Sequence, residues 1–139
     1  VLYSDKEVVT MQNTHPFCFE HTDFILAHNG SLACLDEMKY SLHEYIEPQF
    51  AQQISGTTDS EWIYALFLSR ITKFHEPDSI DAASQALIET LEILGRVRKK
   101  HGIKIASPIN LFVTNGDALL ATRFVFNYGY FPEGMQDEH

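Results

Sequence analysis

Apolar residues recur every three or four positions in three stretches of the chain, which is the spacing of amphipathic helices. The first stretch covers residues 35–46 and ends before Pro48, which cannot continue a helix. The second follows a break at residues 56–58, and the third runs from about Ser79 to Gly102, a residue suited to the position after a helix. Three helices are therefore predicted in the middle of the chain.

The second of these helices carries its own start signal. Thr58 is followed three residues later by Glu61, the pattern of a capping box, in which each side chain accepts a hydrogen bond from the other residue's backbone N–H. Apolar residues then line one face of the predicted helix: Ile63, Leu66, Phe67, Ile71 and Phe74.

Short apolar runs bounded by turn residues predict strands on either side of the helices. Residues 24–27 suit a buried strand that stops at His28, Asn29 and Gly30. Residues 109–125 contain Asn-Gly between two apolar runs, which predicts a β-hairpin with a two-residue type I′ turn. Because the helices are grouped between strands, the order indicates an α+β fold rather than strict strand–helix alternation.

Length and composition predict one domain, residues 1–139, with a flexible tail at residues 126–139. The net charge of −9 argues against a nucleic-acid or anionic membrane partner, and no run of 18 apolar residues exists. The short basic cluster at residues 96–104 is read as complementing the end of a helix. Cys18 and Cys34 form no disulfide framework, so a reducing, cytoplasmic location is expected.

Three short motifs carry the candidate chemistry: Asn-Thr-His-Pro-Phe at residues 13–17, Ala-His-Asn-Gly-Ser-Leu at 27–32, and Gly-Thr-Thr-Asp-Ser-Glu at 56–61. A strand that ends in Asn-Gly presents a side-chain amide and a backbone N–H at one point, and such a pair can hold a negative oxygen. Asn-Gly is also the commonest tight-turn dipeptide, so this motif alone leaves both interpretations open.

Together with residues 111–117 and 121–123, these motifs resemble the class II glutamine amidotransferases, a family of N-terminal nucleophile hydrolases. The chain looks most like the branch that acts on γ-glutamyl compounds in glutathione breakdown and ergothioneine synthesis. The resemblance covers residues 13–123. It implies a four-layer αββα sandwich, supplied only in part by this chain, and cleavage of a γ-glutamyl amide through a cysteine thioester.

The resemblance also implies roles for individual residues. Asn29 and Gly30 would be catalytic and form the oxyanion hole, and Asp59 would bind the α-ammonium of glutamine or a γ-glutamyl substrate. His15 and His28 would border the same substrate site. From its position alone, Asp59 could equally complement the dipole of the helix that it begins. No cofactor or metal is implied, and a partner subunit or a homo-oligomer is compatible with this function.

The sequence departs from the family pattern at its beginning. The family nucleophile is a cysteine at the mature N-terminus, whereas this chain begins with Val1. The family also has an arginine for the substrate carboxylate before the His-Pro stretch, and here no arginine precedes Arg70. Both parts are therefore expected upstream of Val1. The alternative is a noncatalytic or regulatory subunit that binds γ-glutamyl metabolites with the same fold.

Two other kinds of site are less favoured by the sequence. Cys18 lies near His15 and His21 in the sequence and could be a nucleophile with an adjacent base, although an inert thiol is the favoured interpretation. A zinc site is disfavoured because the seven histidines and two cysteines show neither an HExxH motif nor a paired-cysteine motif.

Overall fold

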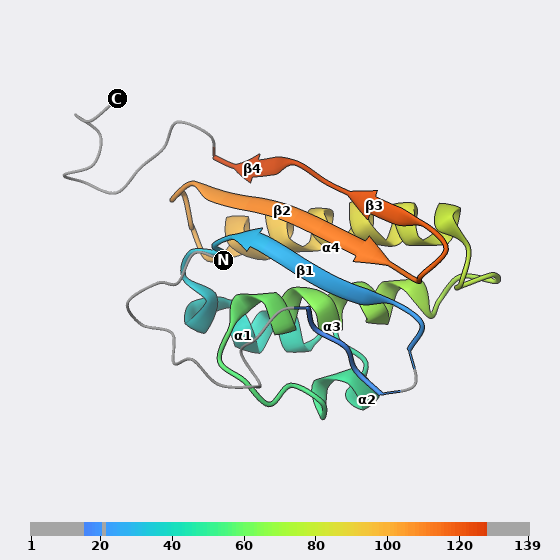
Figure 1. The fold of residues 1–139 in the computed structure, drawn as a ribbon. Helices are drawn as coiled ribbons and strands as arrows, with labels where there is room; N and C mark the ends of the chain where they lie inside the picture. Colours follow the sequence, from blue (N-terminus) through green and yellow to red (C-terminus); the bar gives the residue numbers. More distant parts are fainter. Residues whose placement is uncertain (1–15, 21, 128–139) are drawn as a thin grey trace.

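The computed structural model describes residues 16–20 and 22–127, and Figure 1 shows a sheet with helices against one of its faces. The elements in chain order are β1 (Ile25–Gly30), α1 (Leu35–His43), α2 (Pro48–Ala51), α3 (Asp59–Ile71), α4 (Ile80–Lys100), β2 (Ser107–Thr114), β3 (Leu119–Ala121) and β4 (Phe124–Phe126). The three predicted helices are confirmed as α1, α3 and α4. The first of them ends earlier than predicted, at His43, and the separate turn α2 follows it. The second, α3, ends at Ile71, so Phe74, which was predicted on its face, lies beyond the helix.

Strand β2 is the centre of the sheet. It pairs antiparallel with β1 on one side, and with β3 and β4, which lie end to end, on the other (Figure 1). In the β1–β2 register Asn29 lies opposite Asn110, and Gly30 lies opposite Ile109. Every named pairing is antiparallel, as expected for an α+β fold, and the 76 residues between the end of β1 at Gly30 and the start of β2 at Ser107 contain the helices.

The two faces of β1 have different surroundings. Leu26 and His28 are buried on the face that packs against the helices, whereas Ala27 is only partly buried and Asn29 is exposed. The predicted strand exists, but it is buried on one face only, because side chains of a strand point in turn to opposite faces. We call the other face, with Ala27, Asn29 and Phe112, the outer face.

The predicted four-layer sandwich has more layers than the described residues make. The described residues make two layers, one antiparallel sheet and one set of helices, which confirms the α+β class. The second sheet and second helix layer of a four-layer sandwich are not among the described residues. The sandwich, like the assignment of residues 1–139 to one domain, stays a prediction.

Helix α4 begins and ends with the signals that its sequence contains. The Ser79 hydroxyl accepts a hydrogen bond of 3.1 Å from the N–H of Ala82, which caps the helix start. At the other end Gly102 has φ +65°, and the N–H groups of Gly102 and Ile103 donate to carbonyl oxygens of the last turn at 3.2 and 2.9 Å. This is a Schellman motif, and it confirms Gly102 as the residue after the helix.

The capping box predicted for α3 is wrong in its hydrogen bonds, although the helix does begin after Thr58. The Thr58 side chain makes no capping bond, and its hydroxyl is buried without a partner in the structure. The Glu61 carboxylate instead accepts hydrogen bonds from the N–H groups of Ser55 and Gly56, at 3.0 and 2.6 Å. The preceding loop folds back over the first turn, so Glu61 reaches further upstream than a capping box requires.

The predicted hairpin exists, but its turn is not type I′. Residues 115–118 form a four-residue loop between β2 and β3, and Gly116 has positive φ, whereas Asn115 does not. A type I′ turn needs positive φ at both central residues. Here the side-chain oxygen of Asn115 accepts from the N–H groups of Asp117 and Ala118 at 3.0 and 3.1 Å, which closes the loop through the side chain.

The second half of the hairpin is divided into β3 and β4. Phe126, predicted as the start of a flexible tail, is the last residue of β4 and packs against the core. Residues 128–139, the rest of the predicted tail, lie outside the described residues. Within the described ranges, no helix is both long enough and apolar enough to cross a membrane.

Candidate functional site

The end of β1 and the start of α3 meet beneath the sheet. The N–H of Leu32 donates to Oδ2 of Asp59 at 2.5 Å. His28, which is 7% exposed, places its Nδ1 3.0 Å from the Ser60 hydroxyl and 3.7 Å from Oδ1 of Asp59. The motifs at residues 27–32 and 56–61 are thus joined by side-chain contacts, although 27 residues separate Leu32 from Asp59.

Asp59 is a largely buried carboxylate whose neighbours favour its charged form. Burial alone raises its pKa, but the contacts with His28, the Leu32 N–H and the Ser60 hydroxyl outweigh this effect and lower the pKa below its ordinary value. The position at the first residue of α3 adds the favourable field of a helix N-terminus. Asp59 is therefore negatively charged at neutral pH.

Gly30 ends β1 in a conformation that only glycine fits. Its φ is +137°, and a Cβ atom at this position would overlap with the carbonyl group of Pro108. The same carbonyl oxygen accepts from the N–H of Ser31 at 3.1 Å and lies 3.5 Å from Nε2 of His28. The backbone at Gly30 is consequently held tightly against β2.

Asn29 lies on the outer face of β1, and its neighbour His28 lies on the helix face. Adjacent residues of a strand point to opposite faces, so the Asn29 amide and the Asp59 carboxylate are at the same end of β1 but on different faces of it. The structure therefore brings Asp59 together with His28 and the loop after Gly30, and it does not bring Asp59 into contact with Asn29. His15 lies outside the described residues.

Asn110 is a polar residue near Asn29 that none of the sequence motifs includes. It faces Asn29 across β1 and β2, and its side-chain oxygen is buried without a hydrogen-bond partner in the structure. Alternation along β2 could have placed Asn110 on the same face as Phe112. Its position beside Asn29 depends on the β1–β2 register, which the sequence does not show.

Neither described cysteine forms a nucleophile–base pair with another described residue. Cys18 is exposed and contacts the carbonyl of Phe19, whereas Cys34 is partly buried at the position before α1. His15 and His21, the bases considered for Cys18, lie outside the described residues, so that alternative stays open. Among the described residues, no group of three His, Cys, Asp or Glu side chains could hold a metal ion.

Comparison with solved structures first gives the class of fold. The chain is similar to a glutamine aminotransferase class-II domain protein from Silicibacter pomeroyi, with a TM-score of 0.64 and 24% sequence identity over 84% of this chain and 50% of that chain. The family model described as "Glutamine amidotransferases class-II" matches residues 4–125. The chain belongs to the class-II glutamine amidotransferase family, and the resemblance seen in its motifs is confirmed.

A curated yeast protein is also similar to this chain in sequence. The chain is 28% identical over 129 residues to a protein of Saccharomyces cerevisiae (strain ATCC 204508 / S288c) named "Probable glutamine amidotransferase DUG3". The match covers 85% of this chain and 36% of the yeast protein. The chain thus spans between about a third and a half of the length of the proteins it matches.

Proposed function

We propose that the complete protein cleaves a γ-glutamyl amide through a cysteine thioester, with glutamine or another γ-glutamyl compound as substrate. A cysteine ahead of Val1 attacks the γ-carbonyl carbon, the tetrahedral intermediate expels ammonia or an amine, and water then hydrolyses the thioester to release glutamate. The contact between Leu32 and Asp59 carries the proposal, because it joins two of the family's motifs at one end of the sheet.

Asn29 and Gly30 stabilise the oxyanion in this proposal. Attack on the γ-carbonyl places a negative charge on its oxygen, and donors that are already oriented stabilise that charge without reorganising. The tight packing of Gly30 against Pro108 supports this role, because it fixes the backbone next to Asn29. The exposed side chain of Asn29 is available to a ligand on the outer face.

Asp59 accepts the α-ammonium of the substrate, and His28 orients the carboxylate. The negative charge of Asp59 supports this assignment, and a carboxylate with one bond to Leu32 has further lone pairs for a second donor. Three carbon atoms separate the α-nitrogen of glutamine from its γ-carbonyl carbon. The ammonium site and the oxyanion site therefore lie at different points around the end of β1, and His15 is assigned to the border of the substrate site.

The test uses the complete natural protein. Glutamate release is measured from glutamine and from glutathione, and the nucleophile is then labelled with the glutamine analogue diazo-oxo-norleucine and located by peptide mass spectrometry. We expect glutamate release and a label on an N-terminal cysteine. Binding of glutamine without glutamate release would instead support the noncatalytic subunit, and a label on Cys18 would move the nucleophile into the described chain.

A further inference from the structure

Arg98 is a buried cation without a counter-ion in the described chain. It lies in the last turn of α4 with 2% of its surface exposed. Its guanidinium donates to three neutral acceptors: Ser107 Oγ at 2.8 Å, the Ile105 carbonyl at 2.5 Å and Asn127 Oδ1 at 3.0 Å. None of the ion pairs between described residues includes Arg98, and its Nε has no hydrogen-bond partner.

Such a charge is costly to bury. Hydrogen bonds to neutral groups satisfy individual N–H donors, but they do not neutralise the charge, and buried arginines are ordinarily paired with an anion. Burial accordingly lowers the pKa of Arg98. In a chain with a net charge of −9, an arginine that is buried away from every described carboxylate is unexpected.

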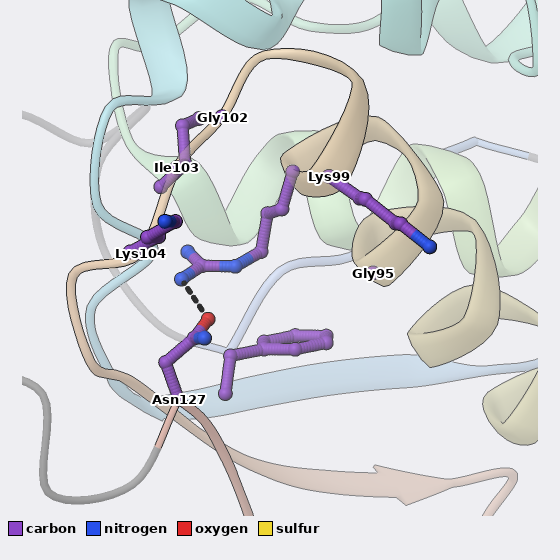
Figure 2. Close-up of a pocket in the computed structure, with 8 residues that line it drawn as sticks. Gly95, Lys99, Gly102, Ile103, Lys104 and Asn127 are labelled. Atoms are coloured by element: carbon purple, nitrogen blue, oxygen red, sulfur yellow. Dashed lines mark hydrogen bonds between the residues drawn. The ribbon is translucent and has the colours of Figure 1, made fainter.

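A cavity of about 300 Å³ adjoins Arg98, and its lining is basic. Lys99 and Lys104 also line the cavity, and none of its lining residues is acidic. Figure 2 shows Lys104 on the loop after α4 and Asn127 on the segment after β4, while the ammonium of Lys99 extends away from both. The ring of Phe126, 5.0 Å from the guanidinium carbon of Arg98, provides an apolar wall.

We propose that this cavity binds a small oxyanion, a phosphate or a carboxylate, with Lys104 and the Asn127 amide as its direct contacts. Asn127 uses its side-chain oxygen to accept from Arg98, so its NH₂ group, which has no acceptor among the described residues, is available to donate to a ligand. Arg98 contributes its field and orients Asn127. The volume exceeds that of a bare phosphate, and the Phe126 wall suits a small organic anion.

The same observations exclude other ligand classes. The cationic side chains of Arg98 and Lys104 repel a metal ion or an ammonium ligand. A polyanion such as nucleic acid is disfavoured by the net charge of −9 on the rest of the chain. The inference does not depend on the proposed amide cleavage, because it rests on the cavity, Arg98 and Asn127 alone.

Phosphate binding to the purified protein tests the proposal. The melting temperature is followed as sodium phosphate or sodium acetate replaces sodium chloride at constant ionic strength and pH 7, because a ligand that binds the folded state raises it in a saturable way. We expect a saturable rise with phosphate, with acetate, or with both. A rise with only one of them identifies the oxyanion that the cavity prefers.

The matched variants are Lys104→Gln and Lys100→Gln. Both remove one positive charge near the end of α4, but Lys100 does not line the cavity. We expect Lys104→Gln to raise the apparent Kd about tenfold, as is typical for loss of a charge-assisted contact, and Lys100→Gln to change it less than twofold. Equal melting temperatures in all three salts, or equal responses of both variants, would overturn the proposal. Exposed Lys104 is used because replacing buried Arg98 would disturb the fold.

Discussion

The N–H of Leu32 and the carboxylate of Asp59 are 2.5 Å apart, so the loop that leaves β1 is tied to the first residue of α3. This hydrogen bond has two further effects. It helps to keep a largely buried carboxylate charged, and it fixes the backbone just beyond Gly30. Asp59 thus both holds the backbone at the end of β1 in place and supplies the negative charge of the candidate site.

The first prediction concerns the pH dependence of stability. We expect Asp59→Asn to lower the free energy of unfolding at pH 7, because the amide retains an acceptor for Leu32 but loses the charge that His28 and the helix start favour. The pKa of Asp59 is lowered on folding. Its stabilising contribution is therefore present above the unfolded-state value near 3.8 and is lost as the pH falls through the lower folded value.

The measurement is urea unfolding of the parent protein and of Asp59→Asn between pH 7 and pH 2.5. The pKa of Glu61 is shifted the other way, raised by burial, so Glu61 favours the folded state below its unfolded pKa and this benefit is lost at higher pH. That effect is shared by both proteins and cancels in their difference. A difference that stays constant across this pH range would show that the charge of Asp59 does not stabilise the fold.

The second prediction separates substrate binding from structure at Asp59. In the complete enzyme, Asp59→Asn should raise the KM for glutamine by about tenfold or more, because a charge-assisted contact with the α-ammonium is lost. A glutamine analogue without the α-amino group should be turned over equally well by the parent protein and the variant. Equal losses on both substrates would mean that Asp59 acts only through the fold.

The third prediction concerns Gly30. Replacing it with alanine combines an unfavourable φ with a steric overlap at the Pro108 carbonyl, so Gly30→Ala should lower the free energy of unfolding by about 3 kcal/mol or more. Gly116→Ala is the matched control. Gly116 also has positive φ, +94°, but a Cβ there meets open space, so a loss of only about 1–2 kcal/mol is expected in urea unfolding. Equal losses of free energy in Gly30→Ala and Gly116→Ala would show that the overlap with Pro108 does not add to the destabilisation.

The helices could be predicted because their signals are local. Apolar spacing located α1, α3 and α4, and the Ser79 and Gly102 signals marked both ends of α4. The capping box at Thr58 failed because the loop before α3 brings other N–H groups to Glu61. Which N–H groups reach Glu61 depends on how the loop before α3 folds back. The Thr58–Glu61 spacing in the sequence carries no information on that loop.

The site was predictable in part, for a similar reason. The resemblance pointed to Asp59 and Gly30 as candidate site residues, and the structure shows the hydrogen bond that Asp59 accepts and the close approach that restricts Gly30; their roles stay predictions. The partners could not be foreseen: Asn110 reaches Asn29 only through the β1–β2 register. The basic cluster that contains Arg98 was predicted only to complement the end of a helix, and the contacts with Ser107, Ile105 and Asn127 that bury Arg98 are not visible in the sequence.

The fourth prediction concerns the unpaired oxygen of Asn110. A buried acceptor without a partner costs about 1–3 kcal/mol, and valine suits a strand, so Asn110→Val should raise the free energy of unfolding by about 1 kcal/mol. Asn115→Ala is the contrasting variant. It removes an acceptor that two N–H groups use, and it should lower the free energy of unfolding by about 1 kcal/mol. Destabilisation by Asn110→Val would indicate that the oxygen is paired in solution.

The last prediction tests Asn29 in the complete enzyme. Asn29→Ala should lower kcat about a hundredfold or more, as loss of one oxyanion donor typically does, with little change in KM. The melting temperature should stay the same, because Asn29 is exposed and its side chain makes no hydrogen bond within the described chain. Gln49→Ala, which removes another exposed amide, on α2, is the matched control and should retain full activity. A loss of less than threefold in Asn29→Ala would remove this side chain from the mechanism, whereas a large loss with an unchanged fold would assign the chemistry to the outer face of β1.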